Sequence, residues 1–190
     1  RLNSYLITDI ALILDAIVYH FFCRNPNGKH FVPKNDLNLI YHGNKDIIIV
    51  NGNHIYHKDY PITFAKNIDG KFLKYKGLRI LGLDGCKVYS FKEHQYTENQ
   101  MKMKILKNIF YLLKGVDIVL SHASPSGIHD VNDGVHDGFK IFHKIIKYFK
   151  PKLWIHGHIH LPNFMVYQDT VIGKTTVSNT FGYRVFIFEK

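Results

Sequence analysis

The sequence predicts an α/β domain, because short apolar segments of strand length alternate with longer segments of helical periodicity. Four apolar segments share one design: each is rich in β-branched or bulky residues and runs into a polar or glycine-containing turn. They lie at residues 46–50, 78–83, 116–120 and 152–155. The chain has 190 residues, of which 46% are hydrophobic, so it can bury a core of its own. We therefore predict one domain over residues 1–190.

Two segments between these strands carry the signals of helices. The first follows Thr97, whose spacing from Gln100 is that of a capping box, and it ends at Gly115. Its apolar residues recur at helical spacing and include Met103, Leu106, Ile109, Phe110 and Leu113. The second helix covers residues 138–149 and is stopped by Pro151.

The N-terminal part of the chain predicts a helix followed by a loop, and the C-terminal part predicts strands. Residues 4–22 are apolar and are interpreted as an amphipathic or buried helix, and residues 23–36 as a loop rich in Pro, Gly and Asn. Charged residues interrupt the apolar segment, so we expect no membrane-spanning helix and no membrane partner. Residues 170–190 predict two or three further strands with glycine turns.

Net charge and cysteine content indicate which classes of partner and which cellular compartment fit the chain. The formal net charge is +10, which favours anionic partners such as phosphorylated substrates, nucleic acid or an acidic protein surface. The lysines are scattered along the chain, so charge alone does not choose among these partners. Cys23 and Cys86 are far apart in the sequence and form no metal-binding or disulfide pattern. This pattern predicts reduced thiols in an intracellular, reducing compartment.

Polar residues follow three of the predicted strands at the point where each strand ends. Asn53 and His54 follow the first strand, His122 follows the third, and His158 and His160 follow the fourth. The carboxyl ends of strands meet at one edge of an open α/β sheet, so these side chains are expected to lie together. Imidazoles suit zinc and iron, and oxygen donors suit manganese or magnesium. The pattern predicts a metal site.

A nucleophilic serine is the competing chemistry at this edge. Ser121 and Ser124 lie close to His122, which could act as a base. Neither serine lies in a Gly-x-Ser-x-Gly turn, and no aspartate is placed by the sequence to orient the histidine. The sequence therefore favours metal chemistry.

Three blocks of the sequence belong together: GNH at 52–54, LSHASPSGIHD at 120–130 and HGHIH at 156–160. In identity and order they resemble the calcineurin-like metallophosphoesterases. A narrower bacterial-type subgroup is similar also in YKGLRILGLDG, QYTENQM and SNTFGYRVFIFE. The resemblance covers residues 46–190, whereas residues 1–45 match poorly.

The resemblance implies a β-sandwich flanked by α-helices, with two divalent ions (Mn, Fe or Zn) at the strand ends. It implies that Asn53, His122 and His158 bind one metal and that His160 binds the other. His54 would be the catalytic histidine. The implied reaction is hydrolysis of a phosphomonoester or phosphodiester by two-metal water activation. A phosphorylated small molecule or a nucleotide-like compound would be the substrate.

Further residues of these blocks, namely His156, Asp130 and His136, would orient the ligands. The chain departs from the family pattern before residue 46. An Asp-x-His block and a Gly-Asp block should precede GNH, but residues 8–11 carry alanine in place of the histidine and residues 42–44 carry asparagine in place of the aspartate.

Two explanations stay open for this departure. Either the chain begins after the two blocks, with the N-terminal strands missing or altered, or the protein has lost its carboxylates. The second explanation implies reduced metal occupancy. It leads to an alternative function, in which a degenerate pseudo-phosphoesterase serves as a structural or RNA- or protein-binding subunit of a larger complex.

Overall fold

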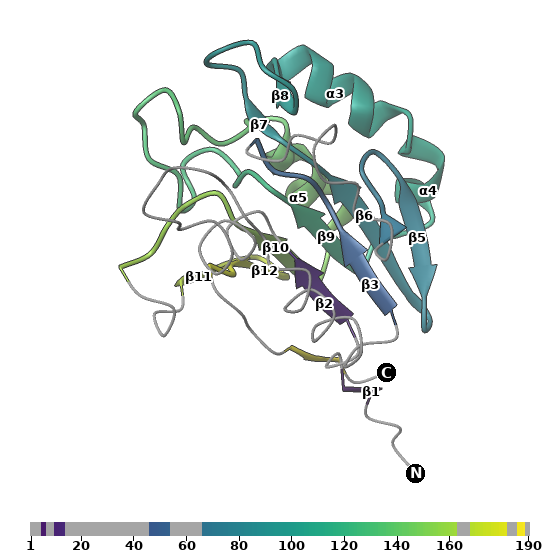
Figure 1. Ribbon diagram of the computed structural model, residues 1–190. Coiled ribbons are helices and arrows are strands. Elements are labelled where there is room, and N and C mark those ends of the chain that lie inside the picture. Colours follow the sequence, from purple (N-terminus) through teal and green to yellow (C-terminus); the bar gives the residue numbers. More distant parts are fainter. Residues whose placement is uncertain are drawn as a thin grey trace, which may run out of the picture.

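Six strands form the central sheet of the molecule (Figure 1). The computed structural model describes residues 5–6, 10–13, 46–53, 66–162, 168–181 and 186–188. Across the sheet the order is β11 (Gln168–Ile172), β12 (Thr175–Asn179), β10 (Leu153–His156), β9 (Ile118–Ser121), β6 (Leu78–Leu83) and β5 (Phe72–Tyr75). The four inner strands are mutually parallel, and the two edge strands run antiparallel to their neighbours. The chain is therefore a mixed α/β structure, and the strands predicted from residues 78–83, 116–120, 152–155 and 170–190 are confirmed.

A smaller parallel sheet joins the strand predicted from residues 46–50 to the N-terminal part of the chain. It has the order β2 (Ile10–Ile13), β3 (Asp46–Ile49) and β4 (Lys66–Asn67). The interpretation of residues 4–22 as a helix is wrong for residues 5–6, which pair with residues 187–188, and for residues 10–13, which pair in register with residues 46–49. A short apolar run fits a strand as well as a helix, and the neighbouring strand decides between them.

Two short strand pairs complete the description of the β-structure. β1 (Tyr5–Leu6) pairs with β13 (Ile187–Phe188) in antiparallel orientation. β7 (Cys86–Lys87) pairs with β8 (Gln95–Tyr96) in parallel orientation and fixes both ends of the loop between them.

The helices follow the central strands in the predicted order. α3 (Glu98–Leu106) begins at the predicted capping box, since Gln100 N donates to Thr97 Oγ1 and Thr97 N donates to Gln100 Oε1. The first predicted helix is divided, because α4 (Ile109–Leu113) starts anew after Asn108. The Asn108 side chain donates to the carbonyl oxygens of Gly70 and Lys104. α5 (Phe142–Phe149) is shorter at its start than predicted.

The buried face of α3 and α4 differs from the one that the spacing of apolar residues suggested. The side chains of Met101, Ile105 and Leu112 are buried against the central sheet. Met103 and Phe110, by contrast, are exposed. Since both faces of this segment carry apolar residues, periodicity alone did not separate the core side from the solvent side.

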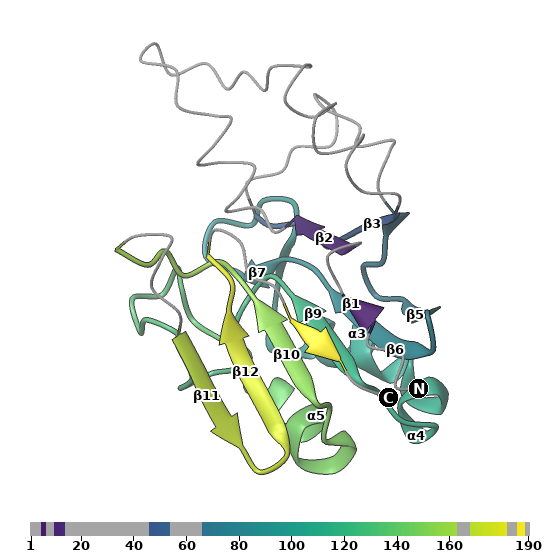
Figure 2. The ribbon, with the colours of Figure 1, turned by 90° about the horizontal axis from the view of Figure 1, so that it is seen from below.

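The central sheet is the middle of three layers (Figure 2). Alternate side chains of a strand point to opposite faces, and the two faces bury different clusters. Leu81, Val119 and Trp154 pack under the helices. Ile80, Ile118, Leu120, Leu153 and Ile155 pack against Ile48 and Val50 from the smaller sheet. The parallel pairing of β6, β9 and β10 places their carboxyl ends at one edge of the sheet. Gly85 N donates to Asn51 O, which brings the carboxyl end of β3 to the same edge.

Among the described residues, no helix has both the length and the apolar character that crossing a bilayer requires.

Candidate metal site

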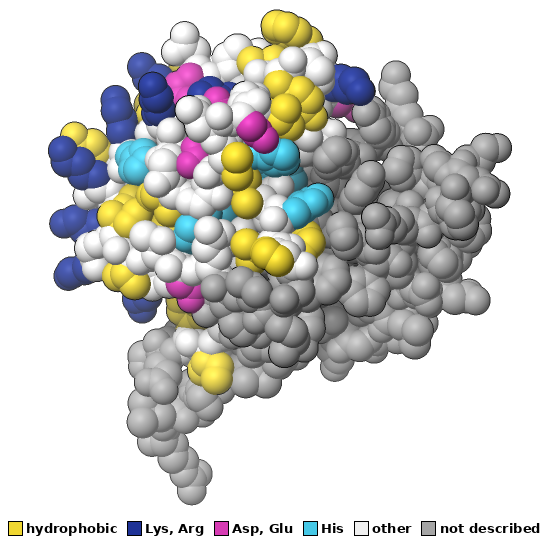
Figure 3. Space-filling model, turned by 90° about the vertical axis from the view of Figure 1, so that its left-hand side faces the viewer, with side chains coloured by type: hydrophobic (Ala, Val, Ile, Leu, Met, Phe, Trp, Pro, Cys, Tyr) yellow, Lys and Arg dark blue, Asp and Glu magenta, His cyan; other side chains and the backbone are white. Residues whose placement is uncertain are grey.

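Three of the predicted ligands meet where β3, β9 and β10 end. Asn53 Oδ1 lies 2.9 Å from His122 Nε2, and His122 Nε2 lies 3.0 Å from His158 Nδ1. The three residues are 5%, 2% and 4% exposed, so the cluster is shielded from solvent. Figure 3 shows histidine side chains gathered on one face of the molecule. The structure therefore brings these three predicted side chains together.

Backbone hydrogen bonds between the strands hold the two histidines in place. His122 N donates to Leu83 O, and Gly157 N donates to His122 O. His158 adopts a left-handed backbone conformation with φ of 66°. That conformation is uncommon outside glycine and is found where surrounding structure enforces it, often at functional sites.

The hydrogen bonds of His158 define which of its ring nitrogens carries the proton. Its Nε2 lies 3.0 Å from the carbonyl oxygen of Val135, which can only accept, so Nε2 is the donor. In the neutral ring Nδ1 then presents a lone pair toward His122. This is the tautomer that a metal ligand needs, with the second nitrogen held by a carbonyl.

The cluster matches the chemistry of a divalent cation. Asn53 Oδ1 and His158 Nδ1 both face His122 Nε2 as acceptors, so a proton on that nitrogen lies between them. A cation that replaced this proton would meet one oxygen and two nitrogen atoms.

The cluster is not a complete all-protein site within the described part of the chain. No group of three His, Cys, Asp or Glu side chains there is arranged to hold a metal ion. The third ligand atom of this cluster comes instead from an amide. His160 is exposed, its ring lies 5.0 Å from that of Phe181, and it is not brought into the cluster. His54, the predicted catalytic residue, lies outside the described residues.

A second pair of histidines lies beside the cluster. His129 Nδ1 lies 2.9 Å from His156 Nε2, and His129 Nε2 lies 2.9 Å from Thr170 Oγ1. His156 Nδ1 donates to Gly157 O, so its Nε2 accepts from His129, whose Nε2 accepts from Thr170. Burial lowers the pKa of His156 to about 3 and also lowers the pKa of His129, which favours the neutral form of both rings.

The other two residues expected to orient ligands lie in the loop before α5. His136 places its ring 4.9 Å from the ring of His158 and bonds to Asp133 through Nδ1. Asp130 accepts hydrogen bonds from the backbone N–H groups of Gly127 and Gly138. Asp130 therefore shapes the loop that brings Val135 and His136 to His158.

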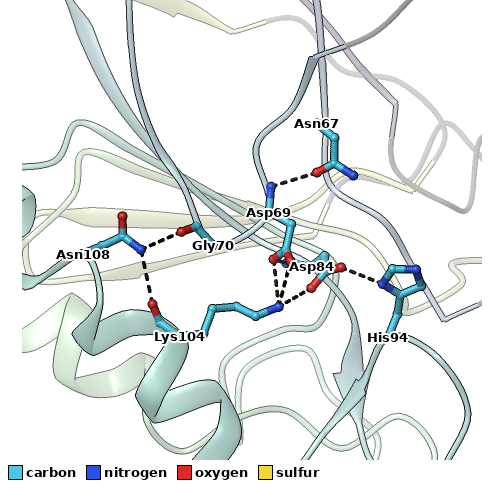
Figure 4. A network of polar contacts seen from close by, with 7 residues as sticks. All are labelled: Asn67, Asp69, Gly70, Asp84, His94, Lys104 and Asn108. Carbon is cyan, nitrogen blue, oxygen red and sulfur yellow. Dashed lines mark hydrogen bonds and ion pairs between the residues drawn. The ribbon is translucent and has the colours of Figure 1, made fainter. Parts of the chain in front are cut away.

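Two carboxylates near this edge are engaged with a lysine (Figure 4). Asp84 directly follows β6, and Asp69 lies in the turn after β4. Lys104 Nζ from α3 lies 2.8 Å from Asp69 Oδ1 and 2.5 Å from Asp84 Oδ1. His94 Nδ1 lies 2.7 Å from Asp84 Oδ2. These two carboxylates therefore do not serve the histidine cluster as ligands.

The charges of this network shift the pKa values of its members. Burial raises the pKa of Asp84, but hydrogen bonds and the nearby Lys104 charge outweigh burial and lower it to about 2. Burial and the neighbouring Asp84 raise the pKa of Asp69. The hydrogen bond to Asp84 raises the pKa of His94. This network was not predicted from the sequence, although the Asp84-Gly85 pair behind a predicted strand was a visible signal.

The serine chemistry is not supported at Ser121. Its Oγ donates to Ala123 O at 2.7 Å and accepts from Trp154 Nε1 at 2.8 Å, and the residue is buried. Because the hydroxyl is occupied by these two hydrogen bonds inside the core, its role is structural.

Two solved structures resemble the chain over most of its length. One crystal structure superposes with a TM-score of 0.58 at 16% sequence identity and covers 95% of this chain and 88% of the other. The crystal structure of TT1561 of Thermus thermophilus gives a TM-score of 0.55 at 12% identity, covering 95% and 86%. At these identities the likeness concerns the fold. No family model and no curated protein matches the sequence.

Proposed function

We propose that this chain is a metal-dependent phosphoesterase domain of the calcineurin-like type, which hydrolyses a phosphomonoester or a phosphodiester. The observation that carries the proposal is the convergence of Asn53 Oδ1, His122 Nε2 and His158 Nδ1 within 3.0 Å contacts at the ends of three strands. The order of the sequence blocks and the two-sheet arrangement support the same family. The substrate class is a phosphorylated small molecule or a nucleotide-like compound.

Each residue has a distinct task in this proposal. Asn53, His122 and His158 hold one divalent cation, and His160 is assigned to a second. Divalent cations bound here would polarise phosphate oxygens and lower the pKa of a water molecule. His54, which directly follows Asn53 in the sequence, contacts the phosphate and gives a proton to the leaving oxygen.

Titration of the purified protein with Mn²⁺, together with hydrolysis of bis-p-nitrophenyl phosphate, tests the proposal. We expect His122→Ala and His158→Ala to weaken Mn²⁺ binding at least about 10-fold and to abolish hydrolysis. His143→Ala, which removes an exposed histidine of α5, is the matched control and should change neither. His54→Ala should retain Mn²⁺ binding and lose about 100-fold or more in rate. Wild-type protein that binds no metal and hydrolyses nothing, unchanged by His54→Ala, would refute the proposal.

The alternative is a pseudo-phosphoesterase that acts as a structural or binding subunit. Its support is the engagement of Asp69 and Asp84 with Lys104, which leaves the described cluster with neutral ligands only. A neutral set of one amide and two imidazoles binds one cation more readily than two closely spaced cations. A metal stoichiometry of two per chain would argue against this alternative.

A further inference from the structure

The Asn53 side chain makes two contacts that depend on the orientation of its amide. Its Nδ2 donates to the Tyr89 hydroxyl at 2.8 Å, while its Oδ1 faces His122 Nε2 at 2.9 Å. A carboxamide has a donor end and an acceptor end, and only the oxygen can bind a cation. The tyrosine contact therefore determines which end faces the histidines.

The backbone of Tyr89 is itself anchored to a buried side chain. Gln95 Oε1 accepts from Tyr89 N at 3.2 Å and from Ser90 N at 2.9 Å, and Gln95 Nε2 donates to Ser90 Oγ at 2.9 Å. Gln95 is only 8% exposed. The hydrogen bonds from Cys86 N to His94 O and from Val88 N to Tyr96 O close the loop at its base.

We infer that Tyr89, held by Gln95, is a positioning residue that fixes the Asn53 amide with its oxygen toward the metal site. This inference rests on the proposed function, because it concerns a ligand of the proposed metal. It gives a role to the first residue of the QYTENQM block, which the helix cap does not use. A rotated amide would present Nδ2 to the cation, and that N–H group would repel it.

The distinguishing experiment is a double-mutant cycle between Tyr89 and Asn53, read out by Mn²⁺ affinity. Tyr89→Phe keeps the ring and removes the hydroxyl, and we expect it to weaken Mn²⁺ binding about 10-fold or more. In the Asn53→Asp background either carboxylate oxygen can face the cation, so Tyr89→Phe should weaken binding less than about 2-fold. Tyr148→Phe, which removes an exposed hydroxyl from α5, is the matched control and should have no effect.

A second measurement tests for the hydrogen bond from Asn53 Nδ2 to the Tyr89 hydroxyl in the metal-free protein. In a ¹⁵N-labelled sample the Asn53 side-chain amide should exchange slowly with solvent, and Tyr89→Phe should accelerate that exchange. Equal losses of affinity in both Asn53 backgrounds, or amide exchange unaffected by Tyr89→Phe, would overturn the positioning role. If the wild-type protein binds no Mn²⁺, the proposed function fails first, and the metal-positioning role fails with it even where the amide is protected.

Discussion

Hydrogen bonds to the far atoms of the ligands prepare the proposed site. Val135 O sets the tautomer of His158, and the Tyr89 hydroxyl sets the amide of Asn53. Neither partner could be predicted from sequence, because both lie in irregular loops whose paths depend on distant contacts. That Asn53, His122 and His158 lie together could be predicted, since each lies within four residues of the end of a strand and strand ends meet at a common edge.

His94 gives the protein a pH-dependent contribution to stability. Its pKa is raised above 6.5 by the hydrogen bond to Asp84, so the folded state holds the His94 proton more tightly than the unfolded state. This contribution is fully present below pH 6.5 and is lost as the pH rises through the folded-state pKa. We expect His94→Asn to lower the thermal midpoint most below pH 6.5 and least in alkaline buffer.

Asparagine suits the test, because His94 has a positive φ of 56° and asparagine tolerates that conformation. The difference between wild type and variant isolates His94, since His129 and His156 titrate in both proteins. A difference in thermal midpoint that stays constant from acidic to alkaline buffer would show that His94 contributes no proton linkage.

At the scale of elements, Lys104 connects α3 to two other parts of the chain. Its ammonium group reaches Asp69, after β4, and Asp84, after β6, and its side chain also lies over the ring of Tyr96 at 3.7 Å. The sequence predicted the start of α3 and its capping box correctly, but neither the end of α3 at Leu106 nor this docking. Helix periodicity identifies a helix, whereas which of two apolar faces is buried depends on the sheet that it meets.

We expect Lys104→Met to destabilise the fold by roughly 3–5 kcal/mol, because it leaves the buried Asp84 carboxylate, and the partly exposed Asp69, without their cation. The Asp84 side chain is 1% exposed and cannot recover solvation without local opening. Lys102→Met is the matched control on the same helix; Lys102 is exposed, and we expect a change within about 0.5 kcal/mol. Urea unfolding of both variants measures the difference, and equal stabilities would contradict the role given to Lys104.

Which strands could be predicted depends on whether the sequence marks their ends or whether only a distant partner strand does. Residues 78–83 were identified without error, because glycine and polar residues bound the run on both sides. Residues 10–13 were misassigned to a helix, because they lie inside a longer apolar segment with no turn signal. Their strand identity comes from pairing with β3, which lies more than thirty residues away in the sequence.

At the scale of the whole molecule, the net charge of +10 favours polyanions but does not specify one. For a phosphoesterase we expect only non-specific RNA binding, whose affinity falls linearly with salt on logarithmic axes, with a slope of about −0.7 per neutralised phosphate. His122→Ala should leave this binding unchanged while abolishing hydrolysis. Fluorescence anisotropy with a labelled single-stranded RNA measures the slope. Sequence-selective binding that persists at about 0.5 M salt would instead favour the binding-subunit alternative.

The proposed site draws its ligands from both sheets. Asn53 follows β3 of the smaller sheet, whereas His122 and His158 follow β9 and β10 of the central sheet. A cation held by all three would act as a cross-link between two layers that otherwise meet through aliphatic side chains such as Ile48 and Ile155. At a concentration about 100 times its dissociation constant, such a cross-link would add about 2.7 kcal/mol to the stability of the folded state. Occupancy of the site and the stability of the two-layer fold are thus thermodynamically linked, and a shift of the melting curve with cation concentration measures that linkage.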